Sequence, residues 1–347
     1  MTQRWIRRPE GSNWGDFGPD DQLGRLNLLT PEKVRKAVNE VREGKVFCLS
    51  LPLDYPGGNK LHPSRFPPEF QPIIRNEKPA RNLPLGKFFP GKTDVVNDER
   101  VLFCSQYSTQ WDGLFHIGSL FDADGDGVAE QVFYNGFKAG EHVTGPLEFL
   151  ADGTERETGQ SIGATRLGIE NMAATGVQGC GVLVDLHAHY GRAFEAVGYD
   201  GLMTVLKADN VNVESGDMLC IYTGFADLVL EMARDPDPDA LHGACTALDG
   251  RDAKLLQWIT DRGVAVLIAD NYAVERLPAR EAATPCANLP LHEHCLFKLG
   301  IHLGELWHLG DLARWLRDHG RSRFLLTAPP LRLPGAAGSP VTPVATV

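Results

Sequence analysis

The 347-residue chain lacks the long apolar segments of a membrane protein, since it has no run of 18 consecutive apolar residues. The first residues, MTQRWIRRPEGSNW, contain no apolar core of a secretory signal. No stretch is strongly basic and the net charge is −11, which argues against nucleic acid as a partner. These absences predict a cytoplasmic protein with no membrane partner.

Paired cysteine motifs are also missing. The chain has seven cysteines, an odd number, and none of them forms a C-x-x-C pair. This usage fits reduced thiols in a cytoplasmic protein better than a disulfide framework or a cysteine-rich zinc site. No internal repeat is visible, so a repeat architecture is not expected.

Short apolar segments alternate with segments of helical periodicity along most of the chain. This alternation predicts an α/β core with a largely buried sheet, in a single domain over residues 1–347. The clearest helix begins at Pro31, after the candidate N-cap Thr30, and ends by Gly44. We expect strands at 46–51, 181–186, 218–223, 263–270 and 324–326, helices at 226–234, 252–262, 291–298 and 309–318, and a Pro/Gly-rich tail after the last strand.

Residues 54–100 interrupt this alternation. They are rich in proline, glycine, asparagine and charge, and they show little periodicity. So long a connection in a compact protein is usually functional or wraps a neighbour. We therefore expect an extended excursion at a subunit interface or over a site, and a homodimer or higher homo-oligomer.

Two further motifs invite a metal-site interpretation that the sequence does not support. DADGDG at 122–127 opens like a calcium-binding EF-hand loop, but the chelating glutamate at position 12 is replaced by Phe133. A solvated acidic turn is the better interpretation. His187 and His189 are two residues apart, and we expect them to be structural or to lie at the rim of a site.

The polar stretch QYSTQWDGLFH at 106–116 directly follows an apolar run. If residues 106–112 are extended, alternate side chains share one face, and the Cα atoms of Gln110 and Asp112 lie roughly 6.5 Å apart. The glycine that follows permits a turn that returns His116 to the same place. By spacing alone, a metal or catalytic site and a polar edge strand are equally open interpretations.

The stretch at 106–116 resembles the signature H-x-G-T-H-x-D-x-x-x-H of the cyclase family of metal-dependent hydrolases, which includes bacterial kynurenine formamidases and isatin hydrolase. Thr109, Asp112 and His116 match, whereas Gln106 and Gln110 replace the two metal-binding histidines. The resemblance covers nearly the whole chain. It extends to SNWGDFGPDDQLGRLNLLTPEKV near the start, GVLVD, SGDMLCIYTG, RGVAVLIAD, LHEHCLFKLGIHLGE and APPLRLPGAAGSPVTPVA.

The resemblance implies a swivelling β/β/α-type fold with a mixed, largely buried sheet. It also implies a divalent ion, zinc or manganese, that activates water. In dinuclear members of the family, the motif aspartate bridges two ions, and a histidine and a glutamate far downstream complete the second site. These positions fall on Asp112, His292 and Glu305 here, with His294 as the alternative to His292.

The two glutamines change the expected metal chemistry. Neutral imidazole is a good ligand for zinc, whereas a carboxamide oxygen is a weak, hard ligand. Gln106 and Gln110 should therefore abolish or greatly weaken one ion site. The remaining set suits one manganese ion, or a zinc ion held less tightly, and it also allows a site that binds no metal. The expected ligands are Asp112, His292 and Glu305, with Gln110 as the fourth.

We therefore expect a metal-dependent hydrolase that acts on the amide, cyclic amide or cyclic ester carbonyl of a small molecule. His116 is the expected proton shuttle, since imidazole titrates near neutral pH. Two alternatives stay open: a metal-assisted cyclase or lyase on a polyketide- or terpenoid-like substrate, and a pseudoenzyme binding protein with an eroded metal site. The residues expected to bind or orient the substrate are Trp14, Gln106, Ser108 and Thr109.

Overall fold

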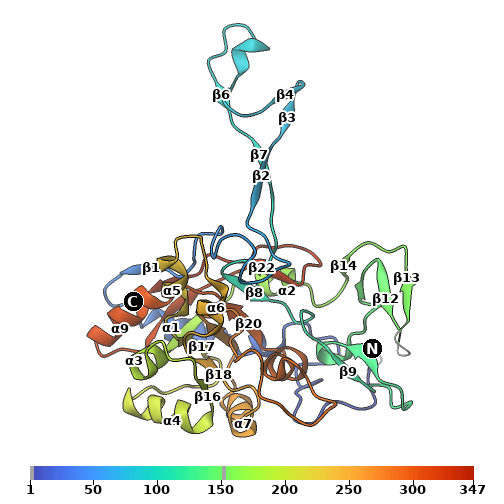
Figure 1. Cartoon of the computed structure of the whole chain (residues 1–347), viewed down its shortest axis with the longest axis vertical. Coiled ribbons are helices and arrows are strands. Elements are labelled where there is room, and N and C mark those ends of the chain that lie inside the picture. Colours follow the sequence, from blue (N-terminus) through green and yellow to red (C-terminus); the bar gives the residue numbers. More distant parts are fainter. Residues whose placement is uncertain (1–3, 151–153) are drawn as a thin grey trace.

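A curled, mixed sheet forms the centre of the body of the protein (Figure 1). The computed structural model describes residues 4–150 and 154–347. Four neighbouring strands run parallel, and antiparallel strands extend the sheet on both sides of them. In sheet order the strands are β1 (Val46–Cys48), β23 (Val344–Thr346), β21 (Arg323–Thr327), β15 (Gln178–Asp185), β17 (Met218–Tyr222), β19 (Val266–Ala269), β20 (His302–Glu305), β8 (Gln110–Asp112) and β22 (Gly338–Pro340).

Both faces of the parallel strands are buried, as their continuous apolar sequences predict. Alternate residues of β19 enter two different hydrophobic clusters: Val266 and Ile268 belong to one, and Leu267 and Ala269 to the other. Because side chains alternate along a strand, the two clusters lie on opposite faces of the sheet. The predicted α/β fold with a mixed, largely buried sheet is confirmed.

Helices pack around this sheet, and their starts follow local signals. The hydroxyl of Thr30 accepts the backbone N–H of Lys33, so α1 begins at the predicted N-cap, but it ends at Val38 rather than near Gly44. No helix in the described part of the chain is long and apolar enough to cross a membrane. The helices are α1 (Pro31–Val38), α2 (Ile169–Ala174), α3 (Leu186–Tyr190), α4 (Tyr199–Ala208), α5 (Phe225–Glu231), α6 (Pro238–His242), α7 (Ala253–Arg262), α8 (Pro290–His292), the π-helical η4 (Glu293–Leu299), α9 (Gly310–Asp318) and the short 3-10 helices η1 (Gly24–Leu28), η2 (Leu85–Lys87) and η3 (Tyr134–Gly136).

The tail after residue 328 contributes two strands to the sheet, so the prediction that the strand at 324–326 is the last one is wrong. β23 lies between β1 and β21, and β22 pairs with β8 at the sheet edge. An edge strand tolerates proline, because a missing N–H need not break the ladder there. The Pro/Gly-rich composition therefore hid an edge strand.

Small two-stranded ribbons lie outside the main sheet. Some of them form a separate group at the right of Figure 1. The two-stranded pairs outside the main sheet and the arm are β9 (Ser119–Phe121) with β10 (Glu130–Val132), β11 (Val143–Thr144) with β14 (Gly163–Ala164), β12 (Leu147–Phe149) with β13 (Glu155–Glu157), and β16 (Ala196–Val197) with β18 (Ala247–Leu248).

The predicted excursion forms an arm, residues 66–102, that projects far from the body (Figure 1). Its ribbon pairs are β2 (Glu69–Pro72) with β7 (Glu99–Leu102), β3 (Ile74–Arg75) with β4 (Lys78–Pro79), and β5 (Leu83–Pro84) with β6 (Val95–Val96). Eight large apolar side chains of the arm are 39–65% exposed: Phe66, Phe70, Ile73, Ile74, Phe89, Val95, Val101 and Leu102. A two-stranded ribbon is marginal on its own, so this arm needs a surface to cover its apolar side chains.

We expect that surface to belong to a second copy of the chain. The wild-type protein should sediment at micromolar concentration as a particle of at least twice the 38.0 kDa chain mass. The double substitution Phe70→Ser and Ile74→Ser should shift it towards the monomer. Val38→Ser, an equally exposed apolar position at the end of α1, should leave the mass unchanged. A wild-type particle of one chain mass would remove this expectation.

Candidate metal centre

β8 and β20 place three polar side chains by their register. The strands run antiparallel, with Gln110 opposite Glu305 and Asp112 opposite Leu303. Gln110 and Asp112 are two residues apart, so both side chains lie on one face of the sheet, as the spacing predicts. Gln110 Nε2 donates to Glu305 Oε2 at 3.0 Å. The edge of the sheet therefore brings an amide and two carboxylates together.

Two tryptophans hold β8 from its other face. Trp111 is fully buried, its Nε1 donates to the carbonyl of Ala328 at 2.8 Å, and its ring meets Trp307 edge-on with centroids 5.0 Å apart. Trp307 Nε1 donates to the carbonyl of Gln110 at 3.1 Å. A Cβ atom on Gly304 would lie 2.8 Å from Trp307 Nε1, so glycine is needed for this packing. The indoles fix the strand that carries the polar face.

Asp112 is fully buried, and its two carboxylate oxygens differ in their surroundings. Oδ1 accepts a hydrogen bond from Gln106 Nε2 at 2.5 Å and lies 4.0 Å from His116 Nε2. Oδ2 has no hydrogen-bond partner among the described residues and lies 4.0 Å from His292 Nε2. The backbone carbonyl accepts from His302 Nδ1 at 2.9 Å. Asp112 thus presents one free oxygen to the centre.

His292 is oriented by Glu275, which lies at the N-terminus of α8. The carboxylate of Glu275 accepts the backbone N–H groups of Leu291 and His292, both at 3.0 Å, and also accepts from His292 Nδ1 at 2.8 Å. With Nδ1 occupied, His292 Nε2 is directed towards Glu305 Oε1 at 3.3 Å. Such a carboxylate on the far nitrogen fixes the tautomer and the ring of a ligating histidine.

Asp112, His292 and Glu305 each offer one ligand atom, and these atoms lie within 4.8 Å of one another. Burial and the charge of Asp112 raise the pKa of Glu305 to about 7. Burial opposes a charge on His292, but its bonds to Glu275 and Glu305 raise its pKa to about 10. Without an ion, a proton on His292 supplies the cation that lets the acids lie together.

The donor set fits a divalent ion. Gln110 Oε1 and Asp112 Oδ2 are both buried, and neither has a hydrogen-bond partner within the described ranges. Buried polar atoms are rarely left without a partner, so two such oxygens beside His292 and Glu305 mark a place for a cation. One imidazole nitrogen with carboxylate and carboxamide oxygens suits manganese or zinc.

His116 lies at the edge of the cluster with its side chain 22% exposed. Its backbone N–H donates to the carbonyl of Gly113 at 2.9 Å, which closes the predicted turn and returns the imidazole to Asp112. Burial lowers the pKa of His116. The charge of Asp112 opposes this shift, and the charges of His292 and Arg65 lower the pKa further. The imidazole is therefore neutral near neutral pH and can accept a proton.

The hydroxyls of Ser108 and Thr109 are used inside the fold, contrary to the prediction that they orient substrate. Ser108 Oγ donates to the carbonyl of Pro52 at 3.2 Å. Thr109 Oγ1 donates to the carbonyl of Leu306 at 2.5 Å and accepts the backbone N–H of Leu51 at 2.9 Å. Both residues are buried, so they attach the loop before β8 to the body.

Gln106 and Trp14, the other two predicted substrate contacts, both make hydrogen bonds within the fold. The side chain of Gln106 holds Asp112, so it positions the cluster. Trp14 is 1% exposed, and its Nε1 donates to the carbonyl of Phe297 at 2.7 Å. Its ring packs edge-on against Trp5, Phe121 and Phe297. Trp14 therefore belongs to the core and offers no surface to a substrate.

Other ionisable groups named in the sequence lie outside the cluster. His294 Nε2 lies 2.9 Å from Thr260 Oγ1, so His292 is the histidine that faces the carboxylates. His189 pairs with Asp209, as expected of a structural histidine. In the acidic turn at 122–127, the carboxylate of Asp122 accepts backbone N–H groups of the same turn. The turn also forms ion pairs with Arg7 and Lys138.

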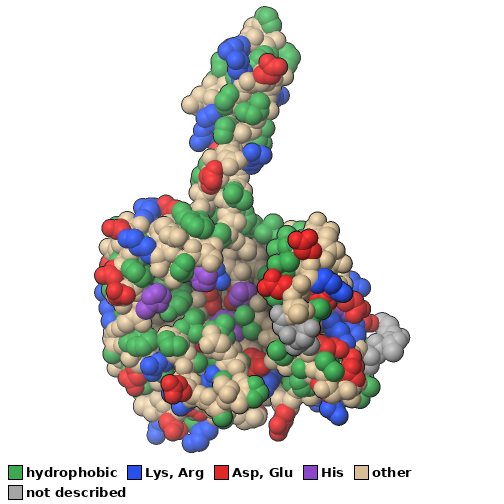
Figure 2. Space-filling model, turned by 45° about the vertical axis from the view of Figure 1, so that its right-hand side comes forward, with side chains coloured by type: hydrophobic (Ala, Val, Ile, Leu, Met, Phe, Trp, Pro, Cys, Tyr) green, Lys and Arg blue, Asp and Glu red, His purple; other side chains and the backbone are tan. Residues whose placement is uncertain are grey.

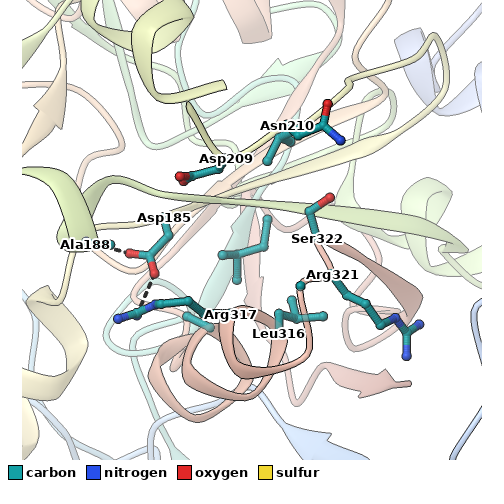
Figure 3. A pocket seen from close by; sticks show the side chains of 12 residues that line it. Asp185, Ala188, Asp209, Asn210, Leu316, Arg317, Arg321 and Ser322 are labelled. Atoms are coloured by element: carbon teal, nitrogen blue, oxygen red, sulfur yellow. Dashed lines mark hydrogen bonds and ion pairs between the residues drawn. The ribbon is translucent and has the colours of Figure 1, made fainter. Parts of the chain in front are cut away.

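Figures 2 and 3 each show a hollow of the body. Figure 2 shows histidine side chains gathered in a hollow of the body below the arm. A separate cavity of about 290 Å³ lies beside α3 and α9, where Arg317 pairs with Asp185 at 2.6 Å (Figure 3). Arg321 also lines this second cavity, and no residue of the cluster does, so the cavity is separate from the candidate centre.

Fold and site together define a mixed α/β protein with a buried two-carboxylate, one-histidine centre at its sheet edge. A profile of the family described as "Putative cyclase" matches residues 47–276. A solved structure described as a novel cyclase is 31% identical, with a TM-score of 0.72, and the match covers 97% of this chain and 99% of that chain. The chain belongs to this cyclase family, as the sequence resemblance indicated.

Two isatin hydrolases share the fold at lower identity. Isatin hydrolase A from Ralstonia solanacearum is 14% identical with a TM-score of 0.53, covering 87% of this chain and 91% of its own. Isatin hydrolase A from Labrenzia aggregata, bound to benzyl benzoate, is 12% identical with a TM-score of 0.53, covering 90% and 95%. No curated protein matches the chain by sequence.

Glu275 was not identified as the partner of His292 from the sequence, and its role can be tested without any ion. Glu275→Gln should lower the pKa of His292 from about 10 towards the ordinary value of 6.5, because one of its two carboxylate partners is lost. Nuclear magnetic resonance titration of the imidazole in chelator-treated protein measures this pKa.

Glu293→Gln is the matched control, since Glu293 lies on the same segment but accepts from Ser119 Oγ. It should leave the titration of His292 unchanged. An unaltered pKa in Glu275→Gln would show that Glu275 does not control the protonation of His292.

Proposed function

We propose that the protein is a metal-dependent hydrolase that cleaves the C–N bond of an amide or cyclic amide in a small molecule. Family membership supports an enzyme of the cyclase type. The observation that carries the proposal is the pair of buried oxygens without partners, Gln110 Oε1 and Asp112 Oδ2, beside His292 and Glu305. One divalent ion, manganese or zinc, would satisfy all four groups.

The roles of the residues follow from their contacts. A bound ion supplies Lewis acidity, which makes water more acidic and a carbonyl more electrophilic. Gln106 holds Asp112 Oδ1, so that Oδ2 remains the oxygen for the ion. Glu275 holds His292 Nδ1, so that Nε2 remains the nitrogen for it. These residues fix a ligand set before any substrate arrives.

His116 moves the proton in this proposal. Its neutral Nε2 accepts a proton from the attacking water, and the resulting imidazolium returns that proton to the leaving nitrogen of the amide. The imidazole lies 4.0 Å from Asp112 Oδ1 and is partly exposed, so it can face both the centre and a substrate. The cleaved amide yields a carboxylic acid and an amine.

The ligand set predicts one ion per chain. Chelation should abolish hydrolysis, and manganese should restore it. His292 has a pKa of about 10, so an ion that binds at Nε2 must displace a proton at neutral pH. The apparent affinity for the ion should therefore rise with pH across neutrality, by roughly tenfold per pH unit if one proton leaves. Calorimetry in buffers of different ionisation enthalpy measures both the stoichiometry and the proton released.

Asp112→Asn and Glu305→Gln should each lower the affinity for the ion by more than roughly tenfold. Asp124→Asn is the control, because Asp124 lies in the separate acidic turn. Binding that survives both ligand substitutions but is lost in Asp124→Asn would place the ion in that turn and contradict the proposal.

His116→Ala should lower kcat by roughly 10²–10⁴-fold while the thermal transition and the ion content stay nearly unchanged. His189→Ala is the control, since His189 pairs with Asp209 away from the centre. Hydrolysis is followed in ¹⁸O-labelled water over a panel of amides and lactams. Full activity of His116→Ala would remove the proton-shuttle role, and a product without ¹⁸O would favour a lyase.

A further inference from the structure

A small cavity adjoins the candidate metal centre. It has a volume of about 30 Å³ and lies between the base of the arm and the end of β20. Leu306 follows Glu305 directly in the chain, and Tyr107 follows Gln106, so two of the cavity walls continue from residues of the centre. The side chains that line it include Leu61, His62, Arg65, Tyr107, Tyr272 and Leu306.

Arg65 connects this cavity with the centre. Its Nη1 donates to the carbonyl of Gln106 at 2.6 Å, and the side chain of Gln106 donates to Asp112. Arg65 is therefore linked with Asp112 through Gln106, which accepts at its backbone carbonyl and donates from its side chain.

The guanidinium of Arg65 forms no ion pair within the described residues, and its hydrogen bond there is to the carbonyl of Gln106. Arg323, which is also half-buried, differs because it pairs with Asp217 at 2.8 Å. A guanidinium has five N–H donors, so most of those on Arg65 remain available to a ligand in the cavity.

The other walls are aromatic rings, the imidazole of His62 and aliphatic side chains. Tyr107 donates its hydroxyl to the carbonyl of Gly58 at 2.9 Å and accepts the N–H of Gly57 at 3.0 Å, so it offers only its ring. Leu61 and Leu306 add aliphatic surface. The cavity thus combines the Arg65 guanidinium and the His62 imidazole with aromatic and aliphatic surface.

We propose that Arg65 binds a carboxylate group of the substrate while the carbonyl that is attacked faces the metal centre. This inference rests on the proposed function and names the class of substrate: an amide that also carries an acid. The planar guanidinium matches a carboxylate with two parallel hydrogen bonds. An acid held by Arg65 fixes one end of the substrate, so the substrate binds in one orientation.

Propionate and propionamide test this inference, because they have nearly the same size and differ in charge. Their affinities are measured by ligand-observed nuclear magnetic resonance with chelator-treated protein, so that no ion can hold the acid. The wild type should prefer propionate. Arg65→Gln should lower the affinity for propionate by roughly 10- to 100-fold and leave the affinity for propionamide unchanged, as expected when a charged hydrogen-bond partner is lost.

Arg65→Lys keeps the charge without the planar fork and should retain part of the preference, which separates loss of charge from loss of folding. Arg100→Gln on β7 of the arm is the control and should bind both probes like the wild type, since Arg100 bonds Gln71. Equal propionate affinity in the wild type and Arg65→Gln would overturn the inference. Because no ion is present, this outcome is independent of whether the centre hydrolyses amides.

Discussion

The repulsion between two buried carboxylates is the constraint on which this protein's centre depends. Asp112 and Glu305 are both almost completely buried, and their oxygens converge. Like charges about 4 Å apart repel by about 4 kcal/mol at an effective dielectric constant near 20, which exceeds the gain from a typical hydrogen bond. The repulsion is relieved by a proton on Glu305, by a protonated His292 or, under the proposed function, by a divalent ion.

The sheet supplies the rigidity that such a centre requires. β8 is a short antiparallel strand added to a buried parallel sheet, and its polar face points to the cluster while Trp111 and Trp307 pack behind it. The carboxylates cannot separate without breaking that packing. Glu275 fixes His292 in the same way from the N-terminus of α8. The scaffold thus holds the two carboxylates and the histidine close together.

The sequence was sufficient for much of this arrangement. The buried sheet follows from periodicity, whereas the convergence of Asp112, His292 and Glu305 was implied by the family resemblance, which carries distant contacts that spacing alone cannot. Local spacing also predicted the turn that returns His116. It misjudged Ser108 and Thr109, because nothing in a sequence shows which hydroxyls will bond to the backbone of a distant loop.

The contacts of Glu275 and Arg65 could not be predicted from the sequence. Their contacts depend on how the long segments before α8 and before β8 return to the centre, and these segments lack helical or strand periodicity. β22 was missed for a related reason, since an edge strand of Gly338, Ser339 and Pro340 has a turn-like composition. Residues that orient others or extend an edge need a structure to be recognised.

Anomalous diffraction from a manganese-soaked crystal tests the central claim most directly. The account predicts one anomalous peak per chain, bounded by Asp112 Oδ2, His292 Nε2, Glu305 and Gln110 Oε1, with His292 still bonded to Glu275. An absence of density there, with His292 still between the two carboxylates at saturating manganese, would contradict it. A peak found only at the acidic turn of Asp122, Asp124 and Asp126 would contradict it equally.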